Sequence, residues 1–173
     1  GQVTGSRPAA GTTPADLARL MRWRRDVRRF RTDPVPEDLL ARGLQAFALA
    51  PSVGLCEPWR LLRVSSTHAR TACLSNFRDC NARALDGFDG DRAATYSRLK
   101  LTGMAEAPIH LAVFCDDGTE KGHGLGAVTM PETRAYSVVG AITHLWLALR
   151  AEGLGLGWVS ILDPARLRQD LDV

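Results

Sequence analysis

The residues with the clearest chemical potential form the run RWRRDVRRFR, residues 22–31, in which six of ten side chains are arginine. Like charges one helical turn apart repel each other, so this cluster is unfavourable without an anionic partner. A phosphate group would relieve the repulsion and accept fork-shaped hydrogen bonds from guanidinium groups. From these residues alone, a phosphate site and a solvated charged face are about equally favoured. Asp26 is expected to be ionised here, and it either organises the guanidinium groups or transfers protons at a ligand.

A nucleic-acid site is disfavoured, although Trp23 and Phe30 lie within the run. Such a site normally has a wider basic face or several aromatic platforms. The 173 residues carry a net charge of only +3 at pH 7, which is too small for a general polyanion binder. We therefore expect no nucleic-acid partner.

The other residues with reactive side chains show no catalytic or metal-binding spacing. The four histidines are scattered over different predicted elements, and the four cysteines form no CxxC pair. We therefore expect no metal site and no disulfide framework, and we expect a reducing, cytoplasmic compartment. Ser160 lies in WVSIL without the G-x-S-x-G elbow of a hydrolase. Its simplest role is that of a buried serine bonded to the backbone.

Two glycine-rich stretches are candidate ligand loops. GHGLGA, residues 122–127, follows a charged loop rather than a strand, which argues against a dinucleotide fingerprint. GLGLG, residues 153–157, is expected at a helix end that leads into a strand. Its glycines either cap and pack, or allow a flat ligand to approach the backbone.

Helices and strands that position these residues follow from apolar spacing and caps. We predict helices that begin near Pro14 and Pro36, and others over 67–84, 92–106, 129–152 and 163–171. Short strands are predicted over 61–65, 109–116 and 155–162. Several long helices with a few short strands indicate the α+β class.

The predicted helix over 129–152 is the most apolar element. Thr129 and Glu132 match a capping box, and apolar side chains occur on nearly every face. This pattern indicates a long buried central helix or a subunit interface. We expect a flexible segment over 1–12 and one domain over 13–173, and no apolar stretch is long enough for a membrane span.

Five stretches together resemble the nitroreductase-like FMN-binding family, and in particular its 5,6-dimethylbenzimidazole synthase branch. They are RRDVRRF, APSVGLCEPWR, LKLTGMAEAPIHLAVFCD, GHGLGAVTMPETRAYS and LWLALRAEGLGLGWVSILDP, and the resemblance covers roughly residues 17–173. It implies an α+β fold with helices packed around a small central sheet. It also implies a homodimer that binds FMN at the subunit interface.

The resemblance implies roles for individual residues. Arg24, Arg25 and Arg28 match residues that hold the flavin phosphate and ribityl chain, in a segment that also contains Asp26 and Val27.

Three more positions complete the implied FMN site. Ser52 matches a segment that lines the isoalloxazine, Leu101 matches a residue near the flavin, and the backbone N–H of Ser160 would face flavin N5. Asp26 and Ser160 are the positions expected to be catalytically important.

The chemistry that the resemblance implies consumes the flavin. Reduced FMN, supplied by a separate flavin reductase, reacts with O2 and is fragmented to 5,6-dimethylbenzimidazole, the lower ligand of vitamin B12, and erythrose 4-phosphate. Two alternatives stay open: an NAD(P)H-dependent FMN nitroreductase or flavin reductase, and a non-catalytic flavin-binding module.

The sequence departs from the family in two places. Glu57 stands where the family commonly has glutamine, and an ionised carboxylate cannot donate a hydrogen bond to the flavin. The family usually continues beyond the position of Val173 with an arm that reaches the partner subunit, so we expect the domain to be truncated there.

Overall fold

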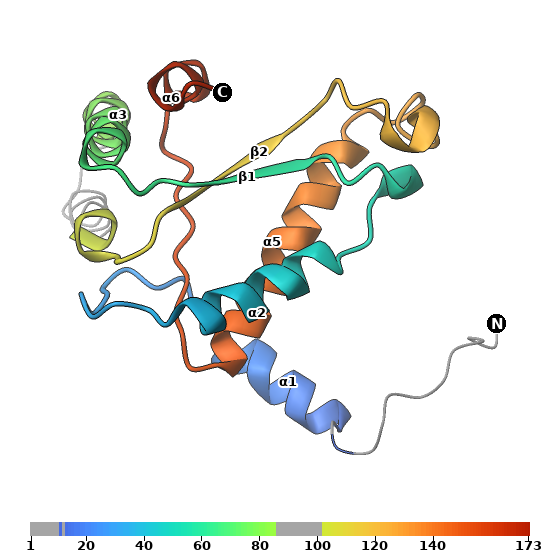
Figure 1. The fold of residues 1–173 in the computed structure, drawn as a ribbon, viewed down its shortest axis with the longest axis horizontal. Coiled ribbons are helices and arrows are strands. Elements are labelled where there is room, and N and C mark those ends of the chain that lie inside the picture. The colour runs from blue at the N-terminus through green and yellow to red at the C-terminus, as the bar shows by residue number, and fades with distance from the viewer. Residues whose placement is uncertain (1–10, 12, 86–101) are drawn as a thin grey trace.

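The computed structural model describes residue 11 and residues 13–85 and 102–173 (Figure 1). The expected flexible segment 1–12 lies almost wholly outside these residues, as does most of the helix predicted over 92–106, of which 102–106 are helical. The helices are α1 Pro14–Trp23, α2 Glu37–Ala48, α3 Thr67–Leu85, α5 Thr133–Ala151 and α6 Pro164–Leu171. Short 3₁₀ turns are η1 Val53–Leu55 and η2 Lys121–Gly124. The strands are β1 Trp59–Arg63 and β2 Leu111–Cys115, and the α+β class is confirmed.

Local capping signals explain where two helices begin. Thr13 and Asp16 form a reciprocal capping box at α1, with Pro14 in the first turn. The Asp163 carboxylate caps α6 by accepting from the N–H groups of Ala165 and Arg166. Both starts follow the sequence prediction.

The arginine run is not helical beyond Trp23, where α1 ends. Arg24 has extended backbone angles, and the run continues without helix through residue 31. The helical repulsion considered from the sequence is therefore reduced, because side chains alternate in direction along an extended chain.

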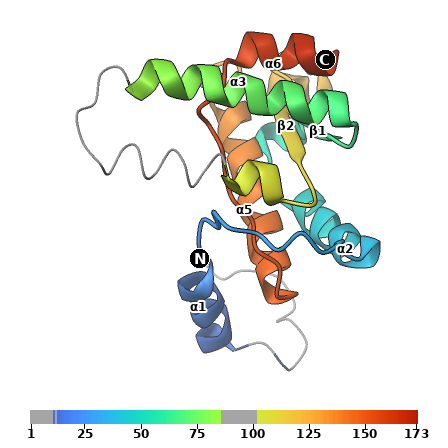
Figure 2. The same ribbon diagram turned by 90° about the vertical axis from the view of Figure 1, so that its left-hand side faces the viewer.

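The sheet consists of β1 and β2 paired in antiparallel register, from Trp59 opposite Cys115 to Arg63 opposite Leu111. In Figure 1 both strands cross the centre of the molecule, with α5 and α2 on one side and α3 and α6 towards the other. Figure 2 shows α3 and α6 lying side by side.

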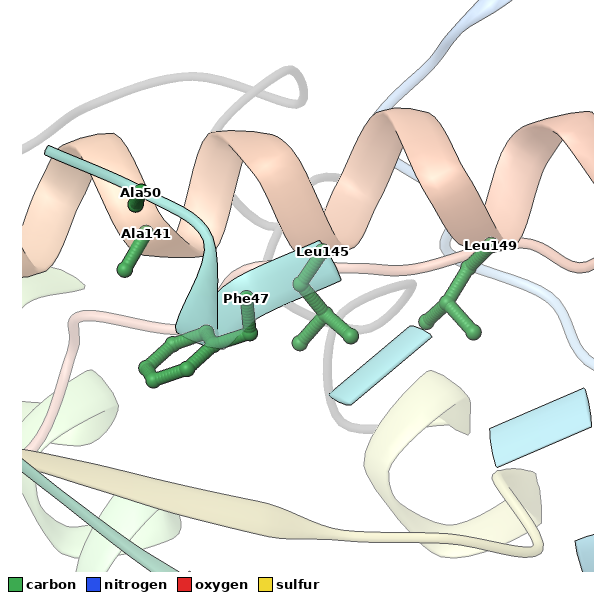
Figure 3. Packing of buried hydrophobic residues seen from close by; sticks show 5 residues of the cluster. All are labelled: Phe47, Ala50, Ala141, Leu145 and Leu149. Atoms are coloured by element: carbon green, nitrogen blue, oxygen red, sulfur yellow. The ribbon is translucent and has the colours of Figure 1, made fainter. Parts of the chain in front are cut away.

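The hydrophobic core lies between α2, α5 and the sheet. Its buried members are Phe47, Ala50, Ala141, Leu145 and Leu149, which Figure 3 shows gathered along α5. Gly43 lets α2 approach α5, since a Cβ there would lie 2.6 Å from Leu149 Cδ2. The prediction of a long central helix is confirmed. Its outer face, however, exposes Tyr136 by 61 % and Val139 by 45 %.

Two local predictions were wrong. Residues 155–162 form no strand among the described residues, and only Leu156 makes an isolated parallel bridge, to Asp26. The Thr129 capping box is also absent: Thr129 Oγ1 donates to the Gly126 carbonyl, and α5 starts after Glu132 without a side-chain cap. The tight glycine turn before α5 holds the threonine instead.

Candidate functional site

Two segments far apart in the sequence lie side by side: residues 24–28, called the arginine segment below, and residues 153–160. Val27 N–H donates to the Leu156 carbonyl at 3.0 Å, and Asp26 Oδ1 accepts from Trp158 N–H at 2.9 Å. Gly157 allows this approach, because a Cβ there would lie 2.2 Å from the Val27 carbonyl oxygen. The two stretches that were singled out from the sequence therefore form one site.

The arginines of this segment differ in their surroundings. The Arg24 guanidinium stacks on Trp146, with 4.7 Å from its carbon to the ring centroid. The Arg24 backbone N–H donates to the Leu20 carbonyl at 2.9 Å, whereas no described residue accepts a hydrogen bond from its guanidinium, so the in-plane N–H groups are available to an anion. Arg25 instead donates to the backbone carbonyls of Arg22 and Arg24. Arg28 Nε lies 3.6 Å from Asp26 Oδ2.

Two tryptophans complete the site, and sequence reasoning did not assign either of them to it. The rings of Trp146 and Trp158 are 6.3 Å apart, and Trp146 Nε1 donates to the Arg25 carbonyl at 3.3 Å. Trp146 lies in the apolar helix that the sequence predicts over 129–152. The sequence contains no signal that links residue 146 to residue 24, because this contact depends on how α5 crosses the arginine segment.

A mostly apolar cavity of about 700 Å³ borders the same segments. Val27, Arg28 and Gly155 line it, as does His110. Burial, and secondarily the charge of Arg70, lowers the pKa of His110. The arginine segment thus borders a partly open, mostly apolar cavity.

Ser52 lies in a different part of the chain. Its Oγ accepts from Glu57 N–H at 3.0 Å, and the adjacent Val53 N–H donates to Ser137 Oγ at 3.0 Å. The arginine segment contacts α5 at Trp146 instead. Trp146 lies nine residues after Ser137, which corresponds to about 13.5 Å along the helix at 1.5 Å per residue. A single chain therefore does not bring Ser52 to the arginine segment.

The remaining predicted site residues are Ser160, Leu101 and Glu57. Ser160 is exposed, and no described residue hydrogen-bonds to residues 159–162. Leu101 lies outside the described residues. Glu57 forms an ion pair with Lys121.

Within the described part of the chain, no three His, Cys, Asp or Glu side chains lie close enough together to hold a metal ion. No helix in the described ranges is long and apolar enough to cross a bilayer.

Fold and site together define a nitroreductase-type protein. The family model for the nitroreductase family matches residues 21–173, and the chain belongs to this family. The chain is 55 % identical to a 5,6-dimethylbenzimidazole synthase of Rhodospirillum rubrum, in a match covering 91 % of this chain and 74 % of that protein. A 5,6-dimethylbenzimidazole synthase of Rhodobacter capsulatus is 46 % identical over 90 % of this chain and 75 % of its own length. A crystal structure of iodotyrosine deiodinase bound to FMN and 3-iodo-L-tyrosine has a TM-score of 0.69 and 25 % identity, covering 90 % of this chain and 80 % of its own.

Proposed function

We propose that the protein fragments reduced FMN with O2 to 5,6-dimethylbenzimidazole and erythrose 4-phosphate, and so supplies the lower ligand of vitamin B12. Flavin is the substrate of this reaction and provides the carbon atoms of the product. The identity of 55 % to a named 5,6-dimethylbenzimidazole synthase supports this activity. The structural observation that carries it is the Asp26–Trp158 hydrogen bond, which joins the acid of the arginine segment to the backbone two residues before Ser160.

The donor set of the arginine segment fits a flavin phosphate. Arg24 is held by Trp146 and keeps its in-plane N–H groups available, and Arg28 adds a second guanidinium beside Asp26. A planar guanidinium group can donate two parallel hydrogen bonds to two oxygens of one phosphate. Arg24, Arg25 and Arg28 would hold the phosphate and ribityl chain, and Val27 would contact the flavin from the apolar side. To bind the phosphate, the Arg25 guanidinium would have to give up its hydrogen bonds to the carbonyls of Arg22 and Arg24.

Asp26 is proposed to move protons during fragmentation. Its Oδ1 is fixed by Trp158 N–H, while its Oδ2 faces Arg28 at 3.6 Å, so the carboxylate has a defined direction. A positioned carboxyl group that transfers a proton typically accelerates a reaction by about 10²–10⁴-fold. Ser160 would act through its backbone N–H, which lies on exposed chain and is proposed to face flavin N5.

We further propose that the active form is a homodimer with two composite sites. Ser52 and the arginine segment lie at contact points on α5 about 13.5 Å apart along the helix, so within one chain they do not meet at a common point. The outer face of α5 exposes Tyr136 and Val139. A second copy packed on this face in the opposite direction would bring its Ser52 loop to the arginine segment of the first.

The dimer proposal is tested by placing a charge on the outer face of α5. Val139→Glu is expected to give a folded monomer in light scattering, with FMN affinity reduced at least about tenfold because a buried unpaired charge opposes association. Leu49→Glu is the matched control, because Leu49 is 80 % exposed and lies at the end of α2. A dimeric Val139→Glu protein with parental FMN affinity would contradict the composite site.

The cell compartment and the source of electrons belong to the same proposal. All four cysteines are free thiols, which is consistent with a reducing, cytoplasmic compartment. A separate flavin reductase is proposed to supply reduced FMN, and no metal is proposed.

The fate of the flavin tests the function. The protein is loaded anaerobically with reduced FMN, O2 is admitted, and the products are separated by chromatography. Formation of 5,6-dimethylbenzimidazole with matching loss of FMN is expected. Intact oxidised FMN as the sole product would refute the proposal and leave a flavin reductase or a flavin-binding module, which turnover with NAD(P)H would separate.

A further inference from the structure

A buried asparagine connects α3 to the backbone beyond Ser160. Asn76 has an exposed fraction of 0 %. Its Nδ2 donates to the Asp163 carbonyl at 3.0 Å, and its Oδ1 accepts from Asp163 N–H at 2.8 Å. The carboxamide thus pairs with both backbone groups of one residue, as a neighbouring strand would.

The segment that contains Ser160 is held at two points. At one end Trp158 N–H binds Asp26, and at the other end Asp163 binds Asn76. No described residue hydrogen-bonds to the four residues between them, 159–162. Within the described ranges these two anchors are the hydrogen bonds that flank the Ser160 backbone, since residues 159–162 pair with no described strand.

The docking of α6 onto α3 does not depend on Asn76 alone. Arg166 of α6 donates to Asp79 at 2.5 Å and to Ser75 Oγ at 2.9 Å, both on α3. Figure 2 shows the two helices side by side. Asn76 differs from these contacts because it holds the backbone that leads into the site rather than a side chain of α6.

We propose that Asn76 is a positioning residue for the flavin reaction: by holding Asp163, it sets where the Ser160 N–H lies relative to the flavin. This inference rests on the proposed function, in which that N–H faces flavin N5. Asn76 itself does not touch the flavin. Its carboxamide suits the role, because an ionised carboxylate lacks the donor and an apolar side chain lacks both groups.

Asn76→Ala removes both hydrogen bonds to Asp163, together with a weak one that Asn76 Oδ1 accepts from Cys80 Sγ at 3.5 Å, and Asn76→Asp removes the donor. Ser75→Ala is the matched control, because it changes the adjacent residue of α3 and removes only a contact to Arg166. For each protein we would measure the rate of FMN fragmentation after O2 is admitted and the dissociation constant of FMN. Thermal unfolding would establish that each variant is folded.

The Asn76 variants are expected to fragment FMN about 10- to 100-fold more slowly, because a displacement of about 1 Å can cost that much. The dissociation constant should change by less than about threefold, because the phosphate is bound by the arginine segment. Ser75→Ala should retain the parental rate. Folded Asn76 variants with the parental rate would overturn the proposal.

Two further measurements separate this proposal from the proposed function. If the parent returns FMN intact, the proposed function is wrong, and the absorption spectrum of bound FMN then tests the positioning role. A spectral shift in Asn76→Ala but not in Ser75→Ala supports that role, and identical spectra overturn it. If neither Asn76 variant folds, hydrogen exchange in the parent decides. Protection of Asp163 N–H at the level of the α3 amides supports the anchor, and exchange as fast as at an exposed amide overturns it.

Discussion

Asp26→Asn separates the proposed proton transfer from the structural role of this side chain. The asparagine keeps an oxygen that can accept from Trp158 N–H, now 2.9 Å from Asp26 Oδ1, but it loses the charge that faces Arg28. A hydrogen bond to a charged group contributes about 1.5–3 kcal/mol and a neutral one about 0.5–1.5 kcal/mol. The Asp26–Arg28 pair is partly exposed, at 31 % and 35 %, and contributes less than about 1 kcal/mol.

The expected loss of stability is therefore about 1–2 kcal/mol, which lowers Tm by about 2–8 °C for a chain of this length. The expected loss of activity is at least 10²-fold, or about 2.7 kcal/mol in activation free energy. Both are measured on the same preparation, by thermal unfolding and by single-turnover formation of 5,6-dimethylbenzimidazole from reduced FMN and O2.

Asp33→Asn is the matched control. Asp33 forms an exposed ion pair with Arg31 at 2.8 Å, so the substitution removes a comparable charge that lies just beyond residues 24–28. It should leave the rate unchanged. If Asp26→Asn forms product as fast as the parent, or if Asp33→Asn slows it equally, the proton-transfer role of Asp26 is wrong.

Three further predictions concern packing, the flavin loop and pH. Gly157→Ala should lower the free energy of unfolding in urea by about 1–3 kcal/mol and weaken FMN binding, because the new Cβ would lie 2.2 Å from the Val27 carbonyl oxygen. Gly118→Ala is the control and should change neither quantity, because its Cβ would meet only Asp116 Oδ1, at 3.6 Å. Glu57→Gln removes the exposed ion pair with Lys121 and adds a donor, so stability should change by less than about 1 kcal/mol and fluorescence titration should show tighter FMN binding. Burial lowers the pKa of His110, so the folded state favours neutral imidazole. The contribution of neutral His110 to the free energy of unfolding should therefore be greatest above the unfolded-state pKa of about 6.5 and should decrease as pH falls below that value. His110→Gln should remove this pH dependence.

Features that depend on neighbouring residues were predictable. The Thr13–Asp16 box of α1 and the Asp163 cap of α6 lie within three residues of their partners, so the sequence shows them directly. The bounds of α3 and β2 follow in the same way from local apolar spacing. The likeness to a flavin family was also visible, because its stretches are contiguous. The roles it implies for Asp26 and Ser160 stay predictions.

Predictions from local patterns were wrong where a predicted strand found no neighbouring strand to pair with, or where a predicted cap residue found another hydrogen-bond acceptor. GLGWVSIL has the composition of a strand, but among the described residues only Leu156 finds a partner, at Asp26. Thr129 has the spacing of a helix cap, but the glycine turn beside it accepts its hydroxyl through the Gly126 carbonyl. Propensity states what a segment can form, and pairing determines what it does form.

By itself, the sequence determined the composition of the site: an arginine run with one acid, and a glycine-rich segment that ends at a serine. Only the tertiary structure decided that these stretches meet, although Asp26 and Trp158 are 132 positions apart in the sequence, and that Asn76 holds the chain beyond Ser160. The physical reason is that hydrogen bonds and ring stacking require atoms within a few ångströms. Residues distant in sequence reach that range only after α2, α5 and the sheet have packed around the common core.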